Sequence, residues 1–182
     1  MRQSNRARII AAALTIIGRK GVDGLTFDAL AEQVGLTRSG IVYHFRTREA
    51  LIAGIAADLL ARWKAEALEA LGKPFETATR AERVTALAVS VLEGALLPGE
   101  LAFLISGRPE AAGLNRAWGS FQRQWIGDPH TLTPAQRVGL LAVDGWWTEL
   151  ASGTECTGAM DAATRALIVS LVSDERGTWE SR

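Results

Sequence analysis

The segment that most constrains the fold is residues 26–51, where two short helical patterns meet at a glycine. Thr26 is a good N-cap for the first pattern, because its hydroxyl can accept a hydrogen bond from an unpaired backbone N–H of the first turn. Leu30 and Val34 follow at helical spacing. Gly35 predicts the helix end, since glycine adopts a positive φ without a Cβ clash. A second helix begins almost immediately.

The second helix, capped by Thr37, is too polar to be buried on all sides. Ile41 and Phe45 lie four residues apart and are its predicted core anchors, so its other side chains face outward. Arginine can pair with guanine, serine and histidine can bond bases or phosphates, and a tyrosine ring can pack on sugar or a thymine methyl. The pattern predicts a DNA-binding helix-turn-helix, although an amphipathic hairpin with a solvated face would share it. The candidate DNA contacts are Thr26, Thr37, Arg38, Ser39, Gly40, Tyr43, His44 and Arg48.

The chain resembles the TetR family of one-component transcriptional regulators over roughly residues 8–52. Two positions depart from the family pattern. Val42 stands where the family usually has a tyrosine that clamps the DNA backbone, and Arg48 stands where it usually has lysine. The residues that carry the resemblance are Leu14, Gly21, Thr26, Leu30, Ala31, Gly35, Leu36, Thr37, Ile41, His44, Phe45, Arg48, Glu49 and Leu51.

Strand patterns are nearly absent from the chain, which predicts an all-α fold. We expect a three-helix helix-turn-helix DNA-binding head over residues 1–48 and a helical effector-binding and dimerisation domain over residues 49–182. Thr79 with Glu82, and Thr133 with Gln136, form two capping boxes, and Pro98 is expected to break the helix after the first box. The expected helices cover about residues 4–20, 26–34, 37–45, 47–71, 79–97, 100–106, 109–126, 133–151 and 161–173.

Charge is distributed unevenly although the chain has 20 basic and 20 acidic residues and a formal net charge of zero. Residues 1–48 hold eight basic and three acidic residues, a net +5, and the rest of the chain carries −5. A basic head on an acidic body would orient toward phosphate. A chance asymmetry is the alternative.

Other sequence features exclude several classes of protein. Cys156 is the only cysteine, so there is no intramolecular disulfide and no zinc-ligand spacing, and we expect neither metal nor cofactor. The N-terminus offers no apolar signal segment, which predicts a cytoplasmic protein. The most apolar stretch, residues 84–105, is interrupted by charges and a proline, so no membrane association is expected.

The last two expected helices predict a homodimer. Apolar residues occupy two adjacent stripes of the helix at 133–151, and the helix at 161–173 has no clear polar face. A helix that is apolar on two sides must be covered on two sides. A second subunit is the simplest cover, and the TetR resemblance implies the same four-helix dimer. The alternative is a helix central to its own domain.

The aromatic residues predict where a small molecule would bind. Leu114, Trp118, Phe121 and Trp125 recur on one helical face, and six tryptophans in 182 residues are many for core packing alone. Large rings that pack imperfectly leave cavities for flat apolar ligands, although plain core packing is the alternative. The candidate ligand-binding residues are Glu93, Phe103, Trp118, Phe121, Trp125, Asp144, Trp146 and Trp147, the two carboxylates serving a cationic or polar group.

Together these features predict a ligand-responsive regulator that binds double-stranded DNA. As a homodimer it would hold a palindromic operator, in the manner of a repressor, until a small apolar or aromatic effector releases it. One alternative is a DNA-binding dimer without an effector. Another is a helical enzyme using Cys156 or His130, but neither residue has a catalytic partner suggested by spacing, so no catalysis is expected.

Overall fold

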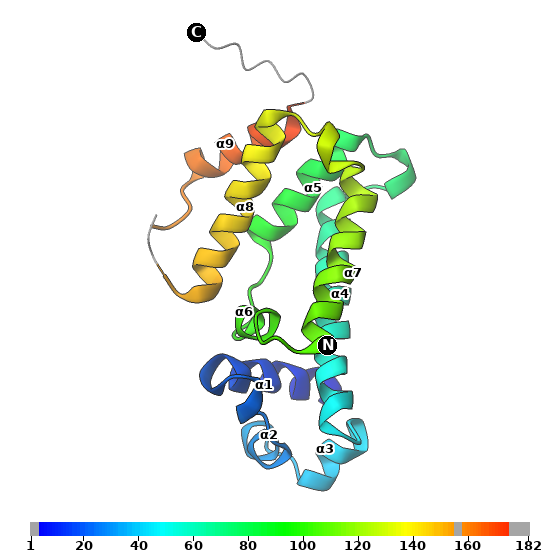
Figure 1. Ribbon diagram of the computed structural model, residues 1–182, viewed down its shortest axis with the longest axis vertical. Coiled ribbons are helices and arrows are strands. Elements are labelled where there is room, and N and C mark those ends of the chain that lie inside the picture. Colours follow the sequence, from blue (N-terminus) through cyan, green and yellow to red (C-terminus); the bar gives the residue numbers. More distant parts are fainter. Residues whose placement is uncertain (1–3, 155–157, 175–182) are drawn as a thin grey trace. The chain divides into compact units, whose positions relative to one another are not determined.

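A computed structural model describes residues 4–154 and 158–174. Within these ranges the chain forms α-helices and short 3-10 turns and no strands, so the predicted all-α class is confirmed (Figure 1). Cα packing divides the chain into two units. The first comprises Met1–Ala61 with Leu96–Ala117, and the second comprises Arg62–Ala95 with Trp118–Arg182.

The first unit is built around buried aliphatic and aromatic side chains. In Figure 1 its first three helices lie together with the beginning of α4. Ile9, Leu14, Leu30, Ile41 and Leu51 are all fully buried. The unit contains α1 (Asn5–Lys20), η1 (Val22–Gly24), α2 (Phe27–Val34), α3 (Arg38–His44), the first part of α4 (Arg48–Leu71), α6 (Glu100–Leu104) and the first part of α7 (Pro109–Ile126).

Helix α6 begins directly against α1, backbone to backbone. Gly99, the N-cap of α6, has a φ of 82°, and a Cβ there would lie 2.2 Å from the Leu14 carbonyl oxygen. A Cβ on Gly18 of α1 would in turn lie 3.0 Å from the Gly99 nitrogen. Glycine is therefore required at position 99, because any side chain there would be strained and would collide with α1, and Gly18 adds room for the close approach.

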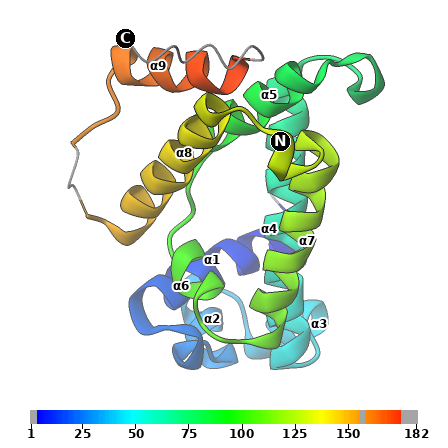
Figure 2. The same ribbon diagram turned by 45° about the horizontal axis from the view of Figure 1, so that its top comes forward.

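The second unit packs α5, α8 and α9 against one another, as both views show (Figures 1 and 2). Val84, Leu87, Val143, Ile168 and Val172 belong to its buried core. A Cβ on Gly139 of α8 would lie 2.6 Å from Val172 Cγ1, so the absence of a side chain there lets α9 pack closely. The unit contains the rest of α4 and of α7, η2 (Phe75–Thr77), α5 (Arg80–Glu93), η3 (Pro129–Thr131), α8 (Pro134–Ser152) and α9 (Ala162–Ser173).

Side-chain capping defines most helix starts, and the caps predicted from the sequence are confirmed. The Thr133 hydroxyl accepts from the Gln136 N–H at 3.1 Å, and the Gln136 side chain accepts from the Thr133 N–H, which completes one of the two predicted capping boxes. These bonds satisfy N–H groups that have no partner inside the helix. The residues whose side chains cap a helix are Ser4, Thr26, Thr37, Thr47, Thr79, Thr133 and Asp161.

The predicted end of α5 at Pro98 is wrong, because α5 ends at Glu93. The Ala95 carbonyl accepts from the Arg62 guanidinium, and the Leu97 N–H donates to the Glu100 carboxylate at 2.7 Å. Side chains thus form hydrogen bonds with backbone groups that would be bonded to other backbone groups if the helix continued. Helix α6 is also shorter than expected and ends at Leu104.

The predicted domain boundary at residue 48 concerns function and stays a prediction. By packing, the first unit continues beyond it through residue 61 and takes in the segment 96–117. Helices α4 and α7 each contribute residues to both units.

Candidate functional site

Helices α2 and α3 form the predicted helix-turn-helix. The Thr26 hydroxyl accepts from the Ala29 N–H at 3.1 Å, and the Thr37 hydroxyl accepts from the Gly40 N–H at 3.1 Å. Between them Gly35 ends α2 in the left-handed conformation, with a φ of 71°. The turn therefore follows from a glycine that can take positive φ and a threonine that restarts the helix.

The inner face of α3 is fixed by Phe45. This residue is buried, and the Arg6 guanidinium lies over its ring, 5.2 Å from the ring centroid. A Cβ on Gly54 of α4 would lie only 2.6 Å from the Phe45 ring, so Gly54 leaves the space that the ring occupies. Arg8 adds a tie between α1 and α2, since its guanidinium donates to the Val34 carbonyl at the end of α2.

The outer face of α3 presents polar and aromatic groups. Tyr43 is 84% exposed, and its ring meets that of His44 edge-on at 5.2 Å. Ser39 is exposed, and its hydroxyl lies 3.0 Å from the Thr37 hydroxyl. Gly40 is partly exposed on the same helix. Because buried side chains anchor the opposite face of α3, this polar face can enter a DNA groove while the unit stays folded.

Arg38 has a partner that sequence reasoning missed. Its Nη1 donates to both carboxylate oxygens of Asp28, at 2.9 and 2.8 Å, although its side chain is 65% exposed. The spacing of ten residues between Asp28 and Arg38 matches no helical contact, so helical periodicity does not predict this pair. The pairing arises because the turn brings the first turns of α2 and α3 together.

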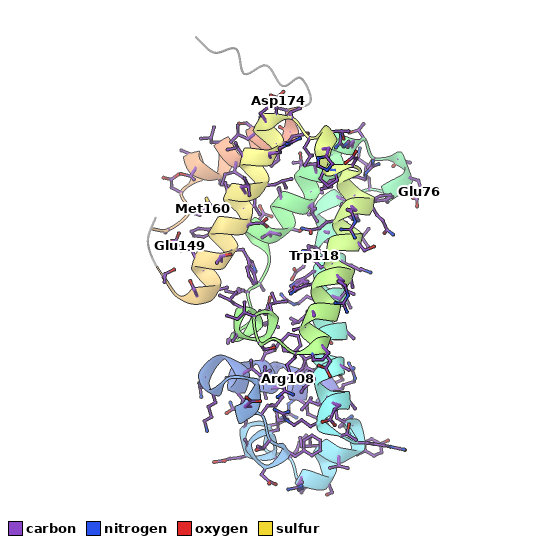
Figure 3. All side chains as sticks on the ribbon, viewed as in Figure 1. Glu76, Arg108, Trp118, Glu149, Met160 and Asp174 are labelled. Atoms are coloured by element: carbon purple, nitrogen blue, oxygen red, sulfur yellow. The ribbon has the colours of Figure 1, made fainter. Side chains whose placement is uncertain are left out.

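Arg48, predicted to contact DNA, is engaged inside the first unit. Its guanidinium donates to the Leu25 carbonyl at 3.1 Å and the Val22 carbonyl at 2.7 Å, and it lies 3.7 Å from the Asp23 carboxylate. Asp23 also pairs with Arg108 at 2.5 Å (Figure 3). A contact from Arg48 to DNA stays a prediction. Arg46, exposed between α3 and α4, makes no ion pair within the described ranges.

The aromatic residues of α7 stand in a continuous row of rings in the second unit. Trp118 (Figure 3) stacks on Phe121 at 5.3 Å, and Phe121 contacts Trp125 at 5.1 Å. Trp63 of α4 extends the row at 5.4 Å from Trp118, and Phe75 extends it at 5.5 Å from Trp125. Trp125 is buried, and the other four rings are partly buried. Trp63 and Phe75 were missed because they lie far away in sequence.

The charged groups that lie on this aromatic row are cations. Lys64 lies 5.4 Å from the Phe121 ring centroid, and Arg83 lies 4.9 Å from that of Phe75. Glu93 is exposed and forms an ion pair with Arg165 of α9. The cation found for Glu93 is therefore a side chain of the same unit.

The remaining predicted ligand residues do not join the row. Phe103 belongs to the first unit, where it is fully buried. Trp146 and Trp147 on α8 are half-buried, and neither ring stacks on another ring within the described ranges. Asp144 is exposed as a residue, although partial burial raises the pKa of its carboxyl above the ordinary value.

Helices α8 and α9 expose apolar side chains. Leu141 is 69% exposed and Leu167 is 59% exposed, and Val138 and Leu150 are also largely accessible. Ile168 and Val172, on the other side of α9, are buried within the unit. The expectation that α9 is apolar on two sides therefore agrees with the structure.

Of the two residues considered for catalysis, the structure describes only His130. His130 lies exposed in η3, where its N–H donates to Asp128 and its carbonyl accepts from Arg137. Cys156 lies outside the described residues. No group of three metal-ligating side chains forms within the described ranges, and none of their helices is long and apolar enough to cross a membrane.

These features define an all-helical protein with a helix-turn-helix near its N-terminus. Residues 9–55 match the family described as "Bacterial regulatory proteins, tetR family". The helix-turn-helix region of the chain therefore matches the TetR family of transcriptional regulators, as the resemblance in its sequence indicated.

Similarity to individual proteins is concentrated in the same region. The chain is 32% identical over 80 residues to tetracycline repressor protein class D of Escherichia coli, covering 44% of this chain and 37% of that one. It is 42% identical over 53 residues to the class A repressor from transposon 1721 of Escherichia coli, covering 29% of this chain and 24% of that one. The matched part thus spans well under half the length of these curated relatives.

The overall fold resembles solved structures over most of the chain. A putative TetR-family transcriptional regulator from Vibrio parahaemolyticus superposes with a TM-score of 0.62 at 18% identity, covering 93% of this chain and 97% of that chain. At this identity the likeness concerns the fold.

Proposed function

We propose that this protein is a transcriptional regulator that binds a palindromic DNA operator as a homodimer and is released by a small effector. The outer face of α3 carries the proposal. Its polar and aromatic side chains are exposed while Ile41 and Phe45 hold the helix from behind. Tyr43 is 84% exposed and, together with Arg38 and Ser39, could contact the bases and backbone of a DNA groove.

Readout would come from Arg38, Ser39 and Tyr43, and backbone contacts from exposed basic residues of the first unit. Arg46 adds a candidate phosphate contact to those predicted from the sequence, because it is exposed beside the start of α4. Arg48 would act mainly by positioning, since it ties the start of α4 to η1 and to Leu25, which follows η1.

The exposed apolar face of α8 and α9 supports a homodimer. Leu141 and Leu167 would be covered by the same residues of a second subunit, as in an isologous interface. A two-fold dimer can hold two half-sites about 34–36 Å apart. The operator would accordingly be an inverted repeat.

The test of DNA binding is selection of sites from a random duplex pool by the full-length protein. We expect an inverted repeat to be enriched. Arg38→Ala should weaken binding to it by about 1–3 kcal/mol at matched salt without changing thermal unfolding. Unselective binding, or an Arg38→Ala variant with wild-type affinity, would contradict the proposal.

The effector would lie against the row Trp63, Trp118, Phe121, Trp125 and Phe75, and would be flat and apolar. The partly buried rings support this position, because they offer aromatic faces next to the core. The cations Lys64 and Arg83 favour an anionic or neutral polar group on the ligand over the cationic group expected from Glu93. Phe103, Asp144, Trp146 and Trp147 remain predictions as ligand contacts.

Tryptophan fluorescence tests the effector site. A naphthalene carboxylate should quench emission and lower operator affinity together, and the matching naphthylmethylamine should do so more weakly. A coupling of about 1–3 kcal/mol is ordinary for such a switch. Trp118→Phe should reduce the quenching, and Trp147→Phe tests whether Trp147 also contacts the ligand, as the sequence predicts. Quenching without any change in operator affinity would leave binding but no regulation.

A further inference from the structure

The pair between Asp28 and Arg38 joins the two helices of the helix-turn-helix on their exposed side. Asp28 is the second residue of α2 and Arg38 is the first residue of α3. Their side chains are 71% and 65% exposed, and both contacts come from one guanidinium nitrogen, Nη1. The pair is therefore a surface feature of the face that we propose reads DNA.

The contribution of this pair to folding is expected to be small. Exposed ion pairs add little to the free energy of unfolding, because water screens them and two side chains lose freedom. A cation in the first turn of α3 is also placed unfavourably in the helix dipole, while Asp28 is placed favourably in that of α2. Asp28 binds Arg38 through both of its carboxylate oxygens, and a role in orienting Arg38 accounts for this better than a role in stability does.

The geometry leaves the donors needed for base recognition available. Within the described residues, Nε and Nη2 of Arg38 make no hydrogen bond, since its contacts to Asp28 use Nη1 alone. Guanine presents two acceptors, O6 and N7, in the major groove, and arginine binds them with two N–H groups. An arginine already held in one orientation loses less side-chain freedom when it binds.

We propose that Asp28 is a positioning residue for base readout: it holds Arg38 so that Nε and Nη2 are presented to one guanine in each half-site. This inference rests on the proposed DNA-binding function. It makes Asp28 a determinant of sequence specificity although its own acceptor-only carboxylate would be repelled by phosphate. Loss of Asp28 should therefore change specific and non-specific binding in opposite directions.

The experiment compares base preferences of the full-length wild type with those of Arg38→Ala, Asp28→Asn and Glu32→Gln. Glu32 lies exposed on α2 and forms no ion pair within the described residues, so Glu32→Gln removes the same charge without touching Arg38. Arg38→Ala identifies the base pair at which preference depends on Arg38. Affinities for the selected operator, for an operator altered at that pair and for random duplex are measured by fluorescence anisotropy at one salt concentration.

Asp28→Asn should lower the preference for guanine at the Arg38-dependent pair by roughly three- to tenfold and raise affinity for random duplex slightly. The other operator positions should keep their preferences, which a merely structural role would not permit. Asp28→Asn added to Arg38→Ala should cause no further loss of preference, and Glu32→Gln should change the affinity for all duplexes alike and leave the base preferences unchanged. Thermal unfolding of each variant checks that the head is intact.

The inference is overturned if Asp28→Asn keeps the wild-type preference at that pair, or weakens all positions equally. It is also overturned if the effects of Asp28→Asn and Arg38→Ala on preference are additive. In those cases the wild type still selects an operator, so the proposed function stands. A wild type that selects no sequence overturns the proposed function together with this inference.

Discussion

Helix α3 and the paired helices α8 and α9 expose faces of opposite chemical character. Helix α3 keeps its apolar anchors inside and presents arginine, serine, tyrosine and histidine. Helices α8 and α9 keep Val143, Ile168 and Val172 inside and still present leucine and valine. Both faces are exposed in the single chain. The face of α3 is polar and the face of α8 and α9 is apolar, so they suit different partners.

This difference indicates two kinds of partner. A polar face with arginine and tyrosine suits a hydrated, negatively charged surface, where contacts can form and break in water. An exposed face rich in leucine and valine is more favourably buried against another apolar surface. A charge placed on the apolar face of α8 should prevent its burial against a partner. Loss of the buried side chain behind α3 should destabilise the helix that carries the polar face.

The largest effect is expected from Leu141→Asp on the apolar face of α8. In the proposed dimer the charge would be buried without a partner, at a cost of several kcal/mol, and a two-fold interface contains the substitution twice. Sedimentation should show monomers, and operator affinity should fall although the head is unchanged. Leu68→Asp, at a half-exposed leucine on α4, is the matched control and should stay dimeric. A monomeric wild type would remove the dimer from the proposal.

The next effect concerns the support behind α3. Phe45→Ala should lower the free energy of unfolding by about 3–5 kcal/mol, because it empties the space between α3, Gly54 and Arg6. Chemical denaturation followed by circular dichroism measures this change. Tyr43→Ala, two residues earlier and largely exposed, should stay within about 0.5 kcal/mol of the wild type. Equal losses for the two variants would contradict the inward and outward assignment of α3.

A smaller effect is expected at the start of α8. Thr133→Ala should cost about 1–2 kcal/mol of unfolding free energy, because it removes the cap to Gln136 and the hydrogen bond to the Asp174 carbonyl. Thr148→Ala removes only a hydroxyl bonded to the Asp144 carbonyl of the same helix and should be close to neutral. Ordinary surface substitutions change the free energy of unfolding by only about 0.3 kcal/mol. A change no larger than this for Thr133→Ala would show that the cap contributes little.

The smallest effect is the pH dependence contributed by Asp144. Partial burial raises the pKa of its carboxyl above the ordinary value of 3.8, so the folded chain binds this proton more tightly than the unfolded chain. The stability contribution is therefore fully present below pH 3.8 and is lost as pH rises through the raised pKa. In Asp144→Asn the stability should no longer fall over this pH range. Unfolding midpoints measured from pH 3.8 to above the raised pKa check this. Parallel profiles for the two proteins would contradict the assignment.

Local rules acting within a few residues determined much of the fold from the sequence alone. The caps at Thr26, Thr37 and Thr133, the left-handed turn at Gly35 and the inward positions of Ile41 and Phe45 all follow from neighbours in the chain. Hydrogen bonds to the first turn and helical periodicity need no information from distant residues. The helix-turn-helix was therefore predictable.

The end of α5 was not predictable from local signals. Pro98 is the visible helix breaker in the sequence, yet the helix stops earlier where Arg62 and Glu100 bind the backbone. Glu100 lies only three residues from Leu97, but Arg62 comes from α4 and is 33 residues from Ala95, so its contact depends on tertiary packing. A proline thus predicted that a helix ends but not where.

Only the tertiary structure decided which side chains share a site. It joined Trp63 and Phe75 to the α7 rings, paired Glu93 with Arg165 and turned Arg48 toward backbone carbonyls. It also brought Asp28 to Arg38 across the turn. Helical periodicity assigns each residue to a face of its own helix, whereas the partner of that face is set by long-range packing. The sequence by itself determined the helices, their caps and the exposed polar face of α3, and the packing determined how the charges and rings on them are combined.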